Sequence, residues 1–284
     1  MKIYSNFDLT NYNSYNLKSH CKTAYFPEND EDIHILFKKG ATKKILIGGG
    51  FNILLSKEYY EEEFVLFNNN YDDCVIDGNS LVCEAGCDMK SISAKALQSS
   101  LSGLEMFYDI PSSLGGAIVM NAGAGGEDIQ KYLQKVTYYN PNKDAFVDIN
   151  KDQIGFEYRN SFFQKNPEMI VCRAYFTLIV GVYSEINSKM QKLKESRWAK
   201  QPREYPNAGS VFKRPPGRFV GPMIDELGLK GLTIGGAKIS EKHSGFIINY
   251  NNATGMDIIN IINLVKQKVL DRFEVDLEVE QRII

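Results

Sequence analysis

The 284-residue chain lacks several features that mark membrane, secreted and nucleic-acid-binding proteins. No apolar run approaches the roughly 20 residues that a membrane span requires, and the first residues lack the apolar stretch of a secretory leader. The 33 basic and 35 acidic residues leave a net charge of −2, which gives no electrostatic case for nucleic acid or an anionic membrane as the main partner. We therefore expect a soluble cytoplasmic protein, in which a local basic pocket could still bind an anionic small molecule.

Cysteine is also scarce, and its pattern excludes a disulfide framework. The cysteines form no CxxC pair, and their number is odd: Cys21, Cys74, Cys83, Cys87 and Cys172. Cys83 and Cys87 flank three residues and have no nearby histidine that would complete a zinc site. We interpret all of them as buried or indifferent thiols of a reducing compartment, and we predict no metal site.

The hydrophobic pattern predicts an α+β protein in two parts. Helical spacing predicts helices over residues 31–39, 90–99, 185–198 and 256–273. Strands are predicted over residues 44–47, 53–55, 64–67, 74–76, 80–84, 136–139, 168–176 and 275–280. An Asp-Gly signal predicts a hairpin turn at 77–79. Residues 103–126 show few signs of a regular element, and we expect a hinge near residues 183–200.

A run of glycines after the strand 44–47 suits an anion. Its residues are Gly48, Gly49, Gly50, Phe51 and Asn52. Without Cβ atoms, several backbone N–H groups can converge on one point, as a pyrophosphate requires. The run is not the GxGxxG fingerprint, because an apolar strand follows it in place of an amphipathic helix. A tight turn explains these residues equally well when they are taken alone.

A second glycine- and serine-rich segment changes that balance. Its candidate cofactor contacts are Ile110, Pro111, Ser112, Ser113, Gly115, Gly116, Asn121 and Ala122. Two such turns, each beside a hydrophobic strand, are what wrapping an extended dinucleotide requires. The serine hydroxyls can meet phosphate oxygens, and the Asn121 amide can meet a flavin or ribityl edge. A purely structural double turn is the alternative.

These two loops resemble the FAD-cradling loops of the UDP-N-acetylenolpyruvoylglucosamine reductases. The resemblance covers nearly the whole chain in order, through Tyr158–Phe163, Ala208–Pro215, Ile224–Gly231, Gly235–His243, Asn249, Asn252–Ala253 and Leu277–Glu280. It implies a vanillyl-alcohol-oxidase-like (PCMH-type) FAD-binding domain over 1–182 with α+β lobes at about 1–56 and 57–182, a linker helix over 183–200, and a smaller α+β substrate domain over 201–284. The short segment between Phe163 and Arg197 resembles the form of the family that lacks a tyrosine-bearing insertion.

The resemblance also implies a reaction and its catalytic residues. Enzymes of this family reduce UDP-N-acetylglucosamine enolpyruvate to UDP-N-acetylmuramate for peptidoglycan synthesis, with NADPH as reductant and FAD as cofactor. Arg159 would stabilise the enolate-like state, Ser210 would protonate C2, and Glu280 would act at the substrate carboxylate. Without the resemblance, these three residues read as a surface arginine, the cap of a turn and part of a solvated strand face. We expect a monomer with a small-molecule substrate and no nucleic-acid or membrane partner.

Four residues are candidate substrate contacts: Tyr158, Asn207, Lys213 and His243. Lys213 belongs to a basic cluster with Lys200, Arg203 and Arg214, which suits the phosphates of UDP or NADPH, although basic loops are more often merely solvated. His243 is as consistent with a buried structural histidine as with a sugar contact.

The chain departs from the family pattern at Phe51, Asp109, Ser112 and Pro222. Phe51 stands where a small residue is usual, Asp109 and Ser112 replace common glycines, and Pro222 replaces a common lysine. We therefore expect the FAD-binding loops to differ locally. Two alternative functions are a flavin oxidase of the same fold, acting on an alcohol or sugar, and a non-catalytic flavin- or nucleotide-binding module. The absence of a histidine after the glycines disfavours a covalent-flavin oxidase, and a mere binder has no use for Ser210.

Overall fold

The computed structural model describes residues 1–68 and 70–284. This part of the chain divides into two compact units, which are described separately. Unit 1 contains Met1–Tyr4, Thr23–Gly49 and Glu62–Glu195, and unit 2 contains Ser5–Lys22, Gly50–Glu61 and Ser196–Ile284. The division into domains 1–182 and 201–284 with a linker stays a prediction. Within the described residues, none of the helices combines the length and the apolar composition that spanning a bilayer demands.

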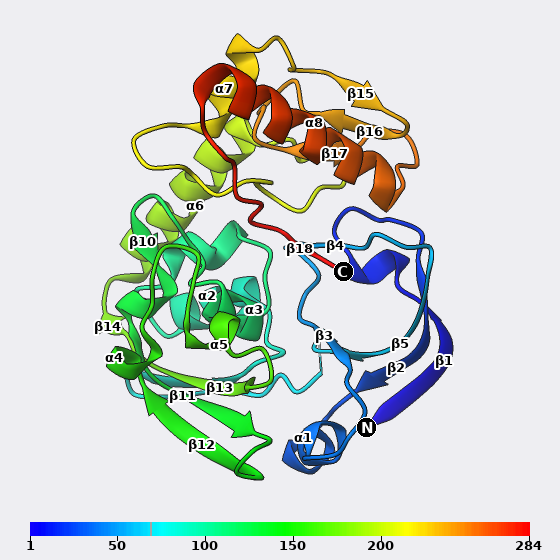
Figure 1. Ribbon diagram of the computed structural model, residues 1–284. Coiled ribbons are helices and arrows are strands. Elements are labelled where there is room, and N and C mark those ends of the chain that lie inside the picture. The colour runs from blue at the N-terminus through cyan, green and yellow to red at the C-terminus, as the bar shows by residue number, and fades with distance from the viewer. Residues whose placement is uncertain (69) are drawn as a thin grey trace. The chain divides into compact units, whose positions relative to one another are not determined.

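Unit 1 contains a five-stranded antiparallel sheet (Figure 1). Its order is β12 (Ala145–Asn150), β11 (Leu133–Asn140), β13 (Ile170–Thr177), β7 (Ser80–Glu84) and β6 (Cys74–Asp77). The predicted strands at 74–76, 80–84, 136–139 and 168–176 are confirmed as β6, β7, β11 and β13. Each is rich in the branched and aromatic residues that suit a pleated, half-buried surface. β12 was missed because its residues are half-buried or exposed, so no buried face marks it as a strand.

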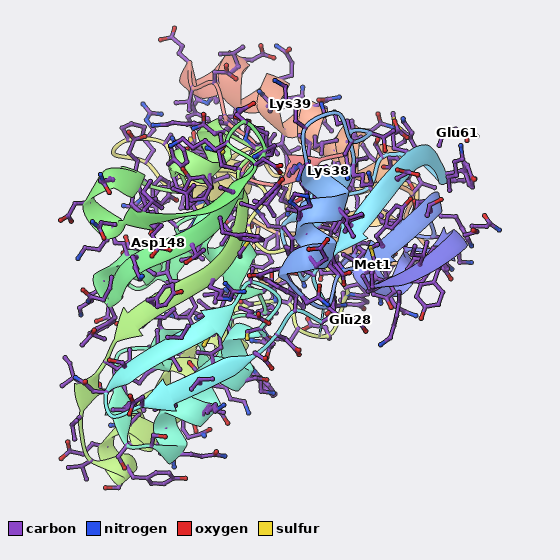
Figure 2. All side chains as sticks on the ribbon, turned by 90° about the horizontal axis from the view of Figure 1, so that it is seen from below. Met1, Glu28, Lys38, Lys39, Glu61 and Asp148 are labelled. Atoms are coloured by element: carbon purple, nitrogen blue, oxygen red, sulfur yellow. The ribbon has the colours of Figure 1, made fainter. Side chains whose placement is uncertain are left out.

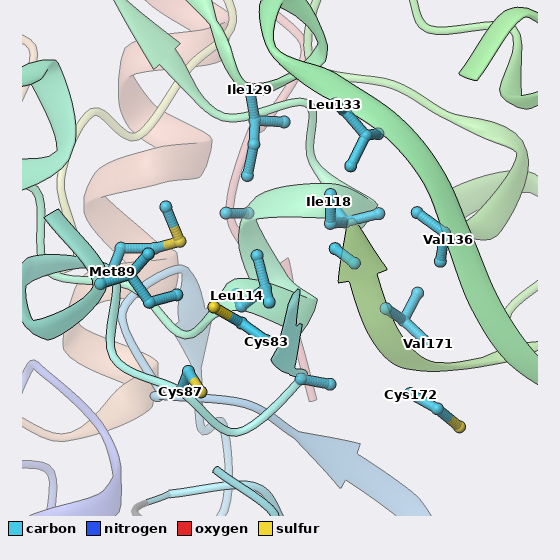
Figure 3. Close-up of a cluster of buried hydrophobic side chains, with 14 of the residues drawn as sticks. Cys83, Cys87, Met89, Leu114, Ile118, Ile129, Leu133, Val136, Val171 and Cys172 are labelled. Atoms are coloured by element: carbon cyan, nitrogen blue, oxygen red, sulfur yellow. The ribbon is translucent and has the colours of Figure 1, made fainter. Parts of the chain in front are cut away.

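Helices of unit 1 cover one face of this sheet, where α2 and α3 lie (Figure 1). Side chains of α3, among them Leu114 and Ile118, gather with Val136 of β11 and Val171 of β13 in the core (Figure 3). The α-helices that lie wholly or mostly in this unit are α1 (Asp30–Phe37), α2 (Met89–Gln98), α3 (Leu114–Val119), α4 (Lys151–Ile154), α5 (Phe162–Lys165) and α6 (Tyr183–Lys200). Short elements complete it: η2 (Glu105–Asp109), η3 (Ile129–Lys131), β8 (Leu101–Ser102) with β14 (Ile179–Val180), and β9 (Gly123–Ala124) with β10 (Glu127–Asp128).

The expectation of an irregular segment over residues 103–126 is wrong, because it contains η2 and α3. The two glycines of α3 lower its intrinsic helix propensity, so the local sequence does not predict a helix there. Tertiary packing stabilises the helix instead, since Leu114, Ala117 and Ile118 are buried. Ser113 caps its first turn by accepting a hydrogen bond from the Gly116 N–H.

A second sheet has the strand order β1, β2, β5, β3. Its strands are β1 (Lys2–Asp8), β2 (His20–Phe26), β5 (Tyr59–Leu66) and β3 (Ile45–Ile47), of which β3 and β5 are parallel. β1 was missed because nearly all its residues are exposed, so no alternation marks it. The chain start is fixed to the first turn of α1 and the residues before it, since the Met1 ammonium lies 2.9 Å from a carboxylate oxygen of Glu28 and 2.9 Å from one of Asp32 (Figure 2).

Unit 2 contains a three-stranded antiparallel sheet and a long helix, α8 (Figure 1). The sheet consists of β15 (Thr233–Ile234), β16 (Ala237–Ile239) and β17 (Ile247–Asn249), and α8 (Gly255–Phe273) packs on it. The predicted apolar stripe of α8 is confirmed as its buried face. The remaining elements are η1 (Thr10–Tyr12), α7 (Val220–Glu226) and the parallel pair β4 (Ile53–Leu54) and β18 (Arg282–Ile283).

The predicted strand over 275–280 is wrong. Its alternation of exposure is present, with Leu277 buried and Glu278 exposed, but only Val279 forms a β-bridge, to Phe212. Two backbone hydrogen bonds hold the segment, from the Lys213 N–H to the Glu278 carbonyl at 2.9 Å and from the Glu280 N–H to the Val211 carbonyl at 2.8 Å. The regular strand β18 begins only at Arg282, where the chain pairs with β4.

Candidate active site

Ser113 joins the two predicted cofactor loops within unit 1. Its Oγ accepts hydrogen bonds from the Gly49 N–H at 3.1 Å and from the Gly116 N–H at 3.3 Å. A Cβ at Gly48 would lie 2.3 Å from the same oxygen, so a larger residue there would displace the Ser113 hydroxyl. The structure thus brings Gly48 and Gly49 together with the start of α3, although 64 positions separate Gly49 from Ser113.

The residues Ala85–Met89 hold the second loop by backbone hydrogen bonds. The Met89 N–H donates to the Ser112 carbonyl at 2.9 Å, and the Gly115 N–H donates to the Ala85 carbonyl at 2.9 Å. A Cβ on Gly115 would lie 3.2 Å from the Cβ of Ala85, which is tighter than an ordinary contact. The loop is therefore closely packed against Ala85–Met89. The Ser112 Oγ is buried and has no hydrogen-bond partner in the described part of the chain.

Asn121 is the second residue of this loop with an unsatisfied buried atom. Its backbone is left-handed, with φ of 43°, and only 2% of the residue is exposed. The Nδ2 group donates to the Glu157 carbonyl at 3.0 Å and to Asp128 Oδ2 at 3.3 Å, whereas Oδ1 is buried without a partner among the described residues. An unpaired buried acceptor costs about 1–3 kcal/mol unless a ligand supplies a donor. Asn121 Oδ1 and Ser112 Oγ therefore offer two polar atoms that a bound polar cofactor such as FAD can satisfy.

Arg159 lies on a tight turn and contacts the Asn121 loop. Glu157 and Asn160 exchange backbone hydrogen bonds of 3.1 and 3.2 Å, and Arg159 between them is left-handed with φ of 54°. Its guanidinium donates to the Gly123 carbonyl at 2.8 Å and to the Asn121 carbonyl at 3.4 Å. Left-handed backbone at a non-glycine residue costs of order 1–3 kcal/mol and is concentrated at functional sites. The geometry thus holds a permanent cation against the predicted cofactor loop.

In unit 2, the last residues of the first glycine run contact the C-terminal segment. Gly50 has φ of 75°, and a Cβ there would lie 2.1 Å from the Tyr12 carbonyl oxygen. Asn52 Nδ2 donates to the Glu280 carbonyl at 3.2 Å, and the Arg282 N–H donates to the Asn52 carbonyl at 3.0 Å. Asn52 therefore holds the backbone at Glu280 and at Arg282. The side chain of the neighbouring Phe51 is exposed.

Ser210 and Glu280 come from two paired segments of unit 2. The Glu280 N–H donates to the carbonyl of Val211, the residue that follows Ser210. Ser210 is exposed and forms a β-bridge with Phe246. Asn207 shapes the turn before Ser210. Its Oδ1 accepts from the Gly209 N–H at 3.1 Å, and its Nδ2 donates to the carbonyls of Pro202 and Tyr205, both at 2.9 Å.

Sequence reasoning missed Gln281 and Tyr15. The Gln281 side chain, 4% exposed as a residue, donates from Nε2 to the Ala208 carbonyl at 3.1 Å and to the Gly209 carbonyl at 3.4 Å. The fully buried Tyr15 hydroxyl donates to Gln281 Oε1 at 3.0 Å, and burial raises the pKa of Tyr15. An amide directly after Glu280 was the available signal for Gln281, whereas nothing in the sequence marks Tyr15.

The other candidate substrate contacts already have protein partners. Lys213 Nζ lies 2.6 Å from Glu278 Oε1, so it must exchange this partner to bind a phosphate. His243 Nδ1 accepts from the Gly245 N–H at 3.1 Å, and burial lowers the pKa of this imidazole. Tyr158 is 56% exposed, and the Arg159 guanidinium lies 5.3 Å from the centre of its ring.

Three comparisons with known proteins agree with one another. Residues 201–284 match the family model described as UDP-N-acetylenolpyruvoylglucosamine reductase, C-terminal domain. The chain is 37% identical over 286 residues to a protein of that name from Caldanaerobacter subterraneus subsp. tengcongensis, which covers 100% of this chain and 94% of the relative. It is 37% identical to one from Francisella tularensis, over 97% of this chain and 98% of the relative. The crystal structure of UDP-N-acetylenolpyruvylglucosamine reductase from Thermus caldophilus is similar, with a TM-score of 0.81, 28% identity and coverage of 99% of this chain and 98% of that one.

Proposed function

The chain belongs to the family of UDP-N-acetylenolpyruvoylglucosamine reductases, and from this premise we propose which of its residues carry out the reaction. It is an FAD- and NADPH-dependent oxidoreductase that reduces UDP-N-acetylglucosamine enolpyruvate to UDP-N-acetylmuramate, a step of peptidoglycan precursor synthesis. The α+β, PCMH-type fold expected from the sequence is confirmed.

Residues of the two glycine-rich loops would hold the cofactor: Gly48, Gly49, Gly50, Phe51, Asn52, Ile110, Pro111, Ser112, Ser113, Gly115, Gly116, Asn121 and Ala122. The observation that carries this proposal is the unsatisfied Oδ1 of the buried Asn121, together with the unsatisfied Oγ of Ser112 in the same loop. When bound, FAD supplies a carrier that accepts a hydride from NADPH and delivers one to C3 of the enolpyruvyl group.

Arg159 would stabilise the negative charge that reduction creates. After hydride addition at C3, charge builds on C2 and spreads into the adjacent carboxylate. A guanidinium keeps its charge at any working pH and can grip a carboxylate through two N–H groups. Because the carbonyls of Gly123 and Asn121 already fix its position, little reorganisation is needed when the charge forms.

Ser210 would hold the proton that C2 receives. A hydroxyl is a weak acid in water, but transfer to a carbanion-like carbon is downhill, so position decides the rate. The turn that Asn207 shapes and the Gln281 contacts to the Ala208 and Gly209 carbonyls support a fixed hydroxyl at Ser210. We assign Gln281 as a positioning residue for Ser210.

Glu280 would act at the substrate carboxylate, either by polarising it or by holding a proton there. Its backbone is held by Asn52 and Val211, which supports a fixed position. Tyr158, Asn207, Lys213 and His243 are proposed to contact the substrate, and for Lys213 this requires release of Glu278. A monomeric state and a cytoplasmic location are further proposals, which size-exclusion chromatography and cell fractionation test.

Two anaerobic half-reactions test the function and the role of Ser210. The purified protein should contain flavin that bleaches with NADPH and recovers its colour when UDP-N-acetylglucosamine enolpyruvate is added. Ser210→Ala should bleach normally but recover much more slowly, while the control Ser184→Ala, at an exposed serine of α6, should match the wild type in both steps.

Each alternative gives a different result. A flavin oxidase would recover its colour with oxygen alone and ignore the enolpyruvyl sugar, and a non-catalytic binder would show no turnover. If Ser210→Ala leaves both half-reactions unchanged, Ser210 is not the proton donor.

A further inference from the structure

Three cysteines of unit 1 converge at the β6–β7 hairpin, and we call Cys74, Cys83 and Cys87 the thiol cluster. The Cys83 thiol donates to the Cys74 sulfur, and the two sulfurs lie 2.9 Å apart. Cys83 and Cys87 are buried in the core that Figure 3 shows, whereas Cys74 is partly exposed. A small reagent can therefore reach the cluster at Cys74. From the sequence alone, these cysteines were interpreted only as buried or indifferent thiols.

The strand register places Cys74 directly opposite Cys83. The hairpin pairs Asp77 with Ser80 across a two-residue turn and Cys74 with Cys83 three pairs further along. In an antiparallel hairpin of this kind the closing pair is hydrogen-bonded and the pairs then alternate, so Cys74 and Cys83 form a non-hydrogen-bonded pair. The Cα atoms of such a pair are about 4.5 Å apart, within the range of about 4.4–6.8 Å that a disulfide requires. The two sulfurs can bond without a shift of either strand.

The surroundings favour a thiolate on Cys74. The hydrogen bond from Cys83, the nearby Cys87 thiol and the charge of Lys95 lower the pKa of Cys74. The thiol of Cys83, which donates to that thiolate, has its pKa raised. A thiolate is the nucleophilic form of cysteine, so the cluster pairs a partly exposed nucleophile with a buried thiol in contact with it.

We propose that Cys74 and Cys83 are an oxidation site, at which a hydroperoxide converts the two thiols into a cross-strand disulfide. The Cys74 thiolate attacks the peroxide, the O–O bond breaks, and the leaving oxygen takes a proton to become water or an alcohol. The Cys83 sulfur then attacks the sulfur of the Cys74 sulfenic acid, the S–O bond breaks, and water leaves with the Cys83 proton. The two thiols together lose two electrons and two protons, and the peroxide gains them.

This site adjoins the backbone that supports the predicted cofactor loop. Cys87 lies within Ala85–Met89, and its carbonyl accepts a hydrogen bond from the Leu114 N–H at 2.8 Å. Oxidation of the hairpin therefore occurs next to the residues that hold the start of α3. The proposal does not depend on the function of that loop, since the chemistry involves only the thiols.

The full-length, reduced protein with its cofactor can be titrated with hydrogen peroxide, counted for thiols and mapped by proteolysis and mass spectrometry. We expect two of the five thiols to disappear, peptides containing Cys74 and Cys83 to become linked, and dithiothreitol to restore both thiols. In Cys83→Ser the link should be lost and a sulfenic acid trapped by dimedone at Cys74. Cys172→Ser, which changes a buried cysteine outside the cluster, should still form the link.

Three outcomes would overturn the proposal. They are retention of all thiols in the wild type, a link that involves Cys87 in place of Cys74 or Cys83, and oxidation of Cys74 to a sulfinic acid without any link. Mapping of the wild type decides among them even if a variant fails to fold. None of these measurements requires turnover, so failure here leaves the proposed reductase mechanism untouched.

Discussion

Replacing Gln281 by leucine tests the buried contact that positions Ser210. The change removes the amide that Tyr15 and the carbonyls of Ala208 and Gly209 share. It leaves the Tyr15 hydroxyl and the Ala208 carbonyl without their Gln281 partner. Because an unsatisfied buried polar group costs about 1–3 kcal/mol, we expect the free energy of unfolding to fall by about 3 kcal/mol.

A double-mutant cycle with Tyr15→Phe isolates the Tyr15–Gln281 hydrogen bond. Tyr15→Phe alone leaves only Gln281 Oε1 unpaired and should cost about 1–2 kcal/mol. In the double variant both partners of this bond are apolar, so the combined loss should be smaller than the sum of the single losses by about 1–2 kcal/mol. Urea denaturation of the protein with bound FAD, followed by circular dichroism, measures all four corners of the cycle.

The same variant should slow one half-reaction more than the other. Loss of the contacts to Ala208 and Gly209 loosens the backbone before Ser210, so return of flavin colour with the enolpyruvyl substrate should slow while bleaching by NADPH is retained. Gln267→Leu, at an exposed glutamine of α8, is the matched control and should change stability by less than about 0.5 kcal/mol. Additive losses of Gln281→Leu and Tyr15→Phe, or a Gln281→Leu protein as stable and as fast as the control, would refute the reasoning.

Three further predictions concern other parts of the site. Arg159→Lys keeps a charge but loses the planar fork, so the return half-reaction should slow about 10²–10³-fold, and an unchanged rate would remove Arg159 from the mechanism. Gly48→Ala should lower the FAD retained after gel filtration because its Cβ would meet Ser113 Oγ at 2.3 Å, and adding Ser113→Ala should restore part of it. Gly221→Ala, whose Cβ would meet open space, should retain FAD fully, and equal retention by Gly48→Ala would contradict the collision. Burial lowers the pKa of His243 below 6.5, so as the pH falls through that value the unfolded chain binds a proton first and stability is lost. His243→Gln should reduce that loss of melting temperature, whereas parallel curves for the two proteins would show that His243 does not cause it.

Much of the fold and part of the site could be predicted from local pattern. Apolar spacing identified the long helix α8 and most strands of the five-stranded sheet, because a helix or strand buries one face with a fixed period. The glycine-rich loops and the order of the motifs identified the family, which the relatives confirm. The residue roles assigned to Arg159, Ser210 and Glu280 stay predictions. Short elements such as α3 were not predicted, since packing of a few buried residues stabilises them despite a low intrinsic helix propensity.

By itself, the sequence determined which residues could carry chemistry, because side-chain type and glycine content are local properties. Tertiary structure alone decided their partners. It joined Ser113 to Gly49 across 64 positions and Tyr15 to Gln281 across 266, and it left Asn121 Oδ1 buried without a partner among the described residues. Hydrogen bonds between such distant residues form only when the whole chain folds and brings them together. The local periodicity of the sequence therefore cannot predict them.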